Sequence, residues 1–195
     1  MAKKTMETNQ IEYLDKFEDN LQAELLKLCT QRGALSGVLL ASEDIDDKWQ
    51  EFAPEYMADS VREINSYPMV AIAWAAYVGM AVAEWWDKDW EKGSTTPYDT
   101  LHGASGFDDM DEHILADILG IALESQEAQF IEDMLRSCAT LAISLIRHEE
   151  IEAQSTKAFY IFSRTARAMY RTGASLRLHA LGYKFEKVPV SELPN

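Results

Sequence analysis

The sequence contains only two cysteines in 195 residues, Cys29 and Cys138, and it has no Cys-x-x-Cys pair and no Cys/His cluster. These absences argue against a zinc site, and a chain of this length can bury a core without disulfides or metals. Both cysteines lie within apolar helical patterns, which predicts two small buried hydrophobic side chains. The basic N-terminal segment is not followed by an apolar stretch, so we expect no secretory signal and a reducing, cytoplasmic setting.

Positive charge is also scarce, because 18 lysines and arginines stand against 33 acidic residues and the formal net charge is −15. This balance argues against a general nucleic-acid binder, whose affinity comes mostly from neutralising phosphates, and against stable adhesion to anionic membranes. Residues 1–156 hold 11 basic and 31 acidic residues, whereas residues 157–187 hold seven basic residues and one acidic residue. We therefore expect no nucleic acid and no membrane among the partners.

The longest stretch that is strongly apolar on all sides is too short for a typical membrane span. Met69–Ala83 has 15 residues, which as a helix cover roughly 22 Å, against about 30 Å of bilayer hydrocarbon. Six of those residues are alanine, which inserts poorly into lipid. A helix that is apolar all round must be enclosed by other helices or by lipid, so we interpret this segment as the central helix of a soluble domain.

We predict that Pro68–Lys92 is one helix around which the rest of the chain is organised. Pro68 suits the first helical position, where its missing N–H costs nothing, and Lys92–Gly93 is a suitable stop. Charged residues appear from Glu84 onward, so the helix should leave the core near that residue. Small residues recur every four positions on one face, where a neighbouring backbone could approach closely: Ala71, Ala75, Gly79 and Ala83.

Helical periodicity runs through most of the remaining chain, and no alternating stretch is long enough for a sheet strand. We therefore predict an all-α, single-domain bundle of about five to seven helices around residues 68–92. The bundle should span residues 9–182, between a flexible tail over residues 1–8 and an extended C-terminal tail over residues 183–195. The other predicted helices cover residues 9–30, a short stretch before Pro54, residues 54–65, 110–123 and 125–153, and a last helix from Ser155 to residue 172 or 181.

Two proline and glycine features shape these boundaries. Pro54 interrupts a helical pattern, and proline inside a helix breaks or kinks it, so we expect two short helices there. Residues 93–109 are rich in Gly, Ser, Thr and Pro and form the one long stretch without periodicity, which is typical of functional or mobile loops. Residues 34–41 are apolar and fit either a short helix or a buried connection.

The basic segment supplies the first candidate site. Arg164, Arg167 and Arg171 lie at spacings of three and four residues, so they share one face of the last helix. Three interpretations are open: ion pairs with the acidic rest of the domain, a site for a phosphorylated or carboxylated ligand, or a face that docks on the acidic surface of another subunit.

Aromatic residues and a histidine supply the second candidate site. Trp86 and Trp90 lie where the central helix leaves the core, just before the long loop that carries His102. The simpler interpretation is that the tryptophans form the edge of the core and that His102 has a capping or surface role. If the loop folds back over the tryptophans, these three residues and the arginine face could form a ligand pocket.

We predict no metal site. The acidic pairs Glu124/Glu127 and Glu149/Glu152 would lie roughly 37 Å apart on a single helix, too far to share an ion. Two pairs in or beside the long loop, Asp99/His102 and Asp109/His113, have spacings compatible with metal ligands, but capping and surface roles explain these residues more simply. A metal or ligand site in this loop stays the alternative.

The sequence contains no motif of a known catalytic type, such as GxSxG, a P-loop, GxGxxG or HExxH. We therefore expect a non-enzymatic interaction or scaffold protein that acts as a homo-oligomer or with a protein partner, and we predict no catalytic residues and no cofactor. The alternative is a small-molecule- or metal-binding helical enzyme that acts on an anionic ligand through Arg164, Arg167, Arg171, Trp86, Trp90 and His102.

Overall fold

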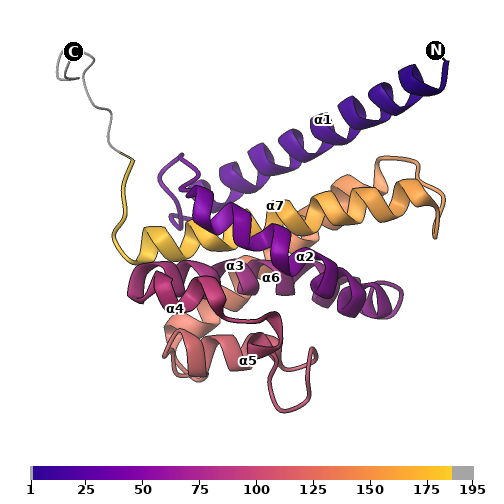
Figure 1. Ribbon diagram of the computed structural model, residues 1–195. Coiled ribbons are helices and arrows are strands. Elements are labelled where there is room, and N and C mark those ends of the chain that lie inside the picture. Colours follow the sequence, from indigo (N-terminus) through magenta and orange to yellow (C-terminus); the bar gives the residue numbers. More distant parts are fainter. Residues whose placement is uncertain (1, 186–195) are drawn as a thin grey trace.

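The computed structural model describes residues 2–185, with side chains from Thr8 onward, and the regular elements in that range are helical. Seven α-helices follow one another, together with a 3-10 turn, η1 (Tyr98–Leu101), and a π-helical turn, η2 (Ile114–Ile118) (Figure 1). The prediction of an all-α bundle is confirmed. The helices are α1 (Ala2–Gln31), α2 (Glu43–Glu63), α3 (Pro68–Lys88), α4 (Trp90–Thr95), α5 (Met110–His113), α6 (Gln126–Arg147) and α7 (Thr156–Ala180).

α3 is the buried centre of the bundle, as its composition predicts. Pro68 occupies the first turn, and 13 of the 21 residues of α3 are buried. Helices α2, α6 and α7 all pack against it. By length and composition alone α3 could cross a membrane, but 72% of its most apolar window lies inside the domain, so the protein itself encloses this helix.

The closest helix contact in the fold joins α3 to α7. Backbone of α7 passes directly over Gly79, because a Cβ added there would lie 2.9 Å from the amide nitrogen of Ala174. The contact is reciprocal, since a Cβ added to Gly173 would lie 2.6 Å from the carbonyl carbon of Ala76. Gly79 of the predicted small-residue stripe is therefore a point where another backbone approaches closely, and Ala76, which meets Gly173, lies outside that stripe.

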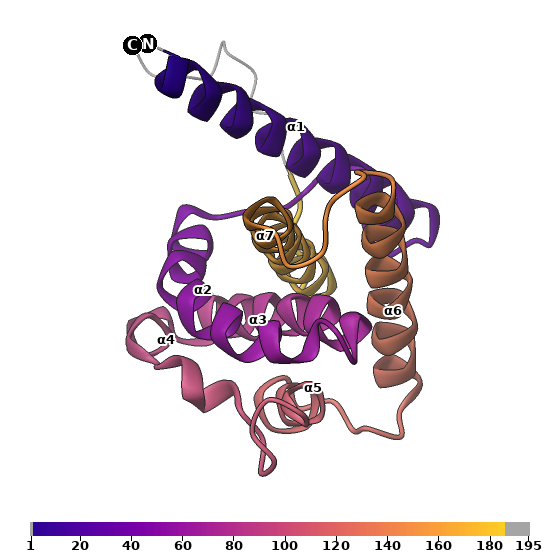
Figure 2. The same cartoon turned by 90° about the vertical axis from the view of Figure 1, so that its right-hand side faces the viewer.

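α7 is a second buried helix. Figure 2 shows it nearly end-on, with α1 above it, α2 and α3 on its left and lower sides, and α6 on its right. Thr165 and Thr172 are fully buried on α7, and each hydroxyl donates to the carbonyl four residues earlier, so neither is left unpaired. Ser175 accepts a hydrogen bond from the Leu40 amide at 2.8 Å, which ties the α1–α2 connection to α7.

The longer of the two lengths predicted for the last helix is correct. Ser155 caps its start by accepting a hydrogen bond from the Ala158 amide. The helix continues through Gly173 and ends in a Schellman motif: Gly182 adopts φ +96°, and the Tyr183 amide donates to the Leu178 carbonyl at 3.0 Å. Most of the predicted C-terminal tail, residues 186–195, lies outside the described residues, as does residue 1 of the predicted N-terminal tail.

The prediction that Pro54 divides α2 is wrong, because Glu43–Glu63 is one continuous helix with Pro54 inside it. Proline removes one backbone donor and disfavours the helix locally. Side chains on both sides of the proline are nevertheless buried on one face, including Trp49, Phe52, Tyr56 and Met57. A break would take part of that face out of the core, so tertiary packing outweighs the local preference.

The central helix ends before the predicted stop at Lys92–Gly93. Asp89 leaves the helical region at φ −164° and ψ 85°, and its side chain then caps α4 by accepting from the Lys92 amide at 3.1 Å. α3 also stays buried beyond the predicted exit, because Glu84 is 1% exposed and the first exposed residue is Asp87.

Glu84 is tolerated in the core because two cations hold it. Its carboxylate lies 2.5 Å from Arg177 Nε and 2.6 Å from Lys88 Nζ. Burial alone would raise the pKa of Glu84, but the hydrogen bonds from Arg177 and Lys88 lower it below its ordinary value. The carboxylate therefore stays ionised between α3 and α7.

The segment predicted as a long loop, residues 93–109, is folded onto the bundle. It contains the end of α4, η1 and an isolated bridge between Gly103 and Gly106. Tyr98 and Leu101 are buried, and the Phe107 carbonyl accepts a hydrogen bond from Trp74 of α3 at 2.9 Å. The segment therefore covers α2 and α3.

Four other boundaries differ from prediction. The first helix begins at Ala2, before the predicted start at residue 9. Residues 34–41 form an irregular connection in which only residues 34 and 35 are buried. The helix predicted over 110–123 is shorter, because Gly120 at φ +69° ends η2. α6 ends at Arg147, and the chain reverses through residues 148–155, where Glu150 and Gln154 adopt positive φ.

Candidate functional site

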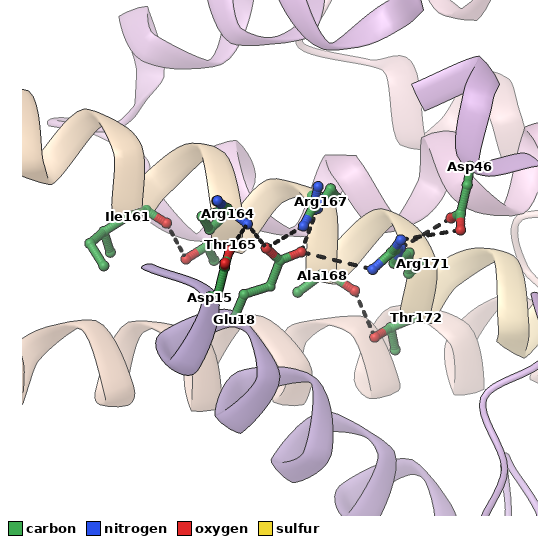
Figure 3. A network of polar contacts seen from close by, with 10 residues as sticks. All are labelled: Asp15, Glu18, Asp46, Ile161, Arg164, Thr165, Arg167, Ala168, Arg171 and Thr172. Carbon is green, nitrogen blue, oxygen red and sulfur yellow. Dashed lines mark hydrogen bonds and ion pairs between the residues drawn. The ribbon is translucent and has the colours of Figure 1, made fainter. Parts of the chain in front are cut away.

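The three arginines of the basic segment lie together on α7, as predicted, and face carboxylates from α1 and α2 (Figure 3). Glu18 of α1 reaches between two of them, with its carboxylate 2.7 Å from Arg164 and 2.5 Å from Arg167. Asp46 of α2 accepts two hydrogen bonds from Arg171, both at 3.1 Å. The guanidinium groups are thus held by the chain's own acids.

The centre of this network is protected from solvent. The side chain of Glu18 is 5% exposed, whereas those of Arg167 and Arg171 are 39% and 34% exposed. Asp15 adds a second carboxylate at 2.9 Å from Arg164. The contacts match the simplest of the three interpretations, a row of ion pairs, and they link the first helix and the second helix to the last one. An external anion would have to compete with these carboxylates for the same donors.

Trp86 and Trp90 are both half-buried at the end of the central helix region. The indole N–H of Trp86 donates to Asp44 at the start of α2, and its ring meets that of Tyr183 edge-on at 5.5 Å. Trp90 begins α4 and packs against the core. Both tryptophans therefore lie at the edge of the core, as the simpler interpretation expects.

His102 contacts α2 near its C-terminal end, whereas Trp86 and Arg171 contact its first turn. Its Nε2 is 2.9 Å from Asp59, whose carboxylate also accepts from the Tyr98 hydroxyl at 3.2 Å. Burial and the charge of Asp59 raise the pKa of Tyr98 well above its ordinary value, so the phenol stays protonated. Asp59 and Asp46 are 13 residues apart on α2, or about 20 Å of helix, so His102 and the arginines do not share one pocket.

The structure offers no metal centre in its described part, because no group of three His, Cys, Asp or Glu side chains there is arranged to hold an ion. The two acidic pairs weighed in the sequence also lie apart, since Glu124 and Glu127 flank the start of α6, and Glu149 and Glu152 follow its end. The Glu149 carboxylate accepts instead from the Tyr13 hydroxyl of α1.

A different feature has the character of a binding surface. An apolar groove with a volume of about 880 Å³ opens between the end of α2, the end of α6, residues 150–155 and the first turns of α7. We call it the α2–α7 groove. Its apolar lining consists of Val61, Ile64, Ile146, Ile151, Ala153, Ala158, Phe159, Ile161 and Phe162.

Two large apolar side chains of this groove face solvent. Val61 on one wall is 41% exposed and Phe159 on the other is 47% exposed. A few charged residues also line the groove, namely Arg147 at the end of α6 and Glu150 and Glu152 in the connecting segment. Exposed apolar side chains together with a few charged ones are typical of a protein-binding patch.

Residues 150–155, which form one wall of the groove, include two residues in an uncommon backbone conformation. Glu150 at φ +44° and Gln154 at φ +63° both occupy the left-handed region, which residues other than glycine rarely adopt. Two such residues within five positions make the turn costly unless the surrounding structure holds it, and such residues cluster at binding sites.

The sequence does not reveal this groove, because Val61 and Phe159 both fall at the helical spacing of the apolar residues in their helices, which favours burial. Phe159 and its neighbour Tyr160 are instead exposed, at 47% and 45%. No local pattern in the sequence distinguishes them from the buried pair Ile161–Phe162 that follows them on α7.

Comparison of the chain with protein-family models, with curated proteins and with solved structures found no match. The functional argument therefore depends on the geometry of this chain alone.

Proposed function

We propose that this protein is a non-enzymatic interaction protein of the cytoplasm and that it acts as a homodimer formed through the α2–α7 groove. The observation that carries the proposal is the exposed apolar lining of the groove, with Val61 and Phe159 presented to solvent on opposite walls. Apolar surface of this kind is favoured to leave water, and the groove offers it in a concave form that a protruding side chain can fill.

We take a second copy of the chain as the occupant of the groove. A contact about a two-fold axis would bring the exposed Phe159 of each copy to the apolar groove of the other.

The contacts of the other candidate residues favour this proposal over the alternatives. The arginine row is engaged by Glu18, Asp15 and Asp46 within the chain, so it offers few unpaired donors to an anionic ligand or to another subunit. His102 and Trp86 contact different parts of α2, so they do not add a reactive group to a shared pocket.

The test is the mass of the protein in solution, measured by analytical ultracentrifugation over a range of micromolar concentrations. Wild type should sediment at twice the 22.1 kDa chain mass. Phe159→Glu and Val61→Glu each place a charge in the groove and should give monomers with unchanged helical circular dichroism. Phe130→Glu is the matched control, because Phe130 is 49% exposed but lies outside the groove, and it should remain dimeric.

Salt dependence separates this contact from one made by the arginine face. Each copy carries a net charge of −15, so the two copies repel each other at low ionic strength. An apolar contact should therefore tighten as sodium chloride is raised, whereas a contact built from intersubunit ion pairs should weaken. A wild-type monomer at every concentration, or a dimer that persists in Phe159→Glu, would overturn the proposal.

A further inference from the structure

The two cysteines of the chain, 109 positions apart in sequence, meet in the core. Cys29 lies in the last turns of α1 and Cys138 in the middle of α6, and their Sγ atoms are 3.7 Å apart. Both residues are 0% exposed. The sequence predicted two buried cysteines separately, but only the fold brings them into contact.

The distance between the sulfurs is one that a small movement can close. A disulfide bond is about 2.05 Å long, so the sulfurs would have to approach by about 1.7 Å. Cys29 lies in the last turn of α1, where its carbonyl accepts hydrogen bonds from the Ala34 and Leu35 amides, so the approach would come from rotation of the two cysteine side chains.

The two thiols are not equivalent. The hydrogen bond from the Cys138 thiol lowers the pKa of Cys29, while burial opposes this effect and the charge of Arg32 assists it. The same hydrogen bond, together with burial, raises the pKa of Cys138. We assign Cys29 as the attacking thiol, with the Cys138 sulfur 3.7 Å away to resolve its oxidised form.

Two hollows lie between α6 and the end of α1 or the segment that follows it, and neither cysteine lines them. One hollow, of about 600 Å³, is lined by Leu28, Arg32 and Leu141, which neighbour the cysteines on the two helices. A smaller one, of about 180 Å³, is lined by Ala34 and Met134.

We propose that Cys29 and Cys138 are a site of reversible oxidative modification, at which hydrogen peroxide converts the pair into a disulfide that fastens α1 to α6. The Cys29 thiolate attacks one peroxide oxygen, the O–O bond breaks, and the departing hydroxide takes up a proton to leave as water, which gives a sulfenic acid on Cys29. The Cys138 sulfur then displaces the hydroxyl group, which leaves as a second water with the Cys138 proton. The two thiols are oxidised by two electrons in total, and the peroxide is reduced to two waters.

This disulfide would not depend on the proposed dimer, because neither cysteine lines the α2–α7 groove. It would close a loop of more than a hundred residues and hold the first helix on the bundle. The effect falls mainly on the unfolded chain, whose freedom a long cross-link reduces most. Oxidation should therefore raise the midpoint of thermal unfolding, by roughly 5–10 °C.

The experiment treats the folded full-length protein with a small excess of hydrogen peroxide and then alkylates it with a maleimide in denaturant. Wild type should lose both reactive thiols together and lose two hydrogen atoms in intact mass. Proteolysis should give one peptide that joins Cys29 to Cys138, and dithiothreitol should restore both thiols. Cys29→Ala and Cys138→Ala are the controls, since alanine keeps a small apolar side chain at each site and neither variant can form the internal bond.

Several results would overturn the inference. One is that both thiols remain open to alkylation in denaturant after peroxide treatment of the folded protein. Another is oxidation that yields only sulfinic acid or disulfides between chains. A disulfide between Cys29 and Cys138 that leaves the midpoint of thermal unfolding unchanged or lowers it would also contradict the inference, because it would show that the native backbone is strained by the bond.

Discussion

Adding one methyl group at Gly173 should destabilise the fold, although the same change stabilises most helices. Gly173 lies inside α7 where that helix crosses α3, and a Cβ there would be 2.6 Å from the Ala76 carbonyl carbon and closer still to its oxygen. Ordinary contacts of a Cβ begin at about 3.4 Å, so the two backbones would have to separate by roughly 1 Å or more. The neighbour is backbone, so no side-chain rotation can relieve the clash.

Two opposing effects set the magnitude. Replacing glycine by alanine in a helix interior gains about 1 kcal/mol from helix propensity alone. Overpacking in a closely packed interior costs about 1–3 kcal/mol and more where backbone must move, so we place the cost here at about 4 kcal/mol. Gly173→Ala should therefore lose about 3 kcal/mol net, which for a chain of this size lowers the thermal midpoint by roughly 6–12 °C.

Urea denaturation followed by circular dichroism measures this difference, with the slope of the transition checked for constancy. Gly79→Ala should behave in the same way, because the contact is reciprocal. Ser144→Ala, on an exposed position of α6, is the control and should stay within about 0.5 kcal/mol of wild type. A Gly173→Ala protein that is as stable as wild type, or more stable, would refute the close helix contact.

Two further substitutions test the charged groups of the fold. Glu18→Gln removes the buried carboxylate, 5% exposed, that holds Arg164 and Arg167, and it should lower the free energy of unfolding by about 3 kcal/mol in the same urea assay. Asp15→Asn changes a carboxylate that is 53% exposed and should lower it by less than about 1 kcal/mol. Burial raises the pKa of Asp111 to about 6, so ionising it opposes folding as pH rises from about 4 through 6. Asp111→Asn should therefore be about 1–2 kcal/mol more stable than wild type at pH 7.5 and no more stable at pH 4; an equal gain at both values would contradict the assignment.

Local patterns were sufficient to predict the helices themselves. The spacing of apolar residues identified the regions of α1, α2, α6 and α7, and Ser155 correctly marked the start of α7. Boundaries were predicted less well where they depend on contacts with distant segments. Pro54 remains inside a helix because residues on both sides of it are buried, and α6 ends early because the chain must reverse to bring α7 back over α3.

The candidate sites show the same division. That three arginines share one face of α7 follows from their spacing, but nothing near them in the sequence indicates that Glu18 lies between two of them. Trp86, Trp90 and His102, hypothesised to share a ligand pocket, each contact a different part of the bundle.

By itself, the sequence determined that this protein is all-helical and that an uncharged helix with a small-residue face lies at its centre, because side-chain spacing and the need to keep apolar surface from water act locally. Only the tertiary structure decided which acids meet the arginines, that the two cysteines touch, and that Val61 and Phe159 remain exposed beside a groove. Those outcomes depend on how helices far apart in the chain are placed against one another, and periodicity within one helix carries no information about its neighbour.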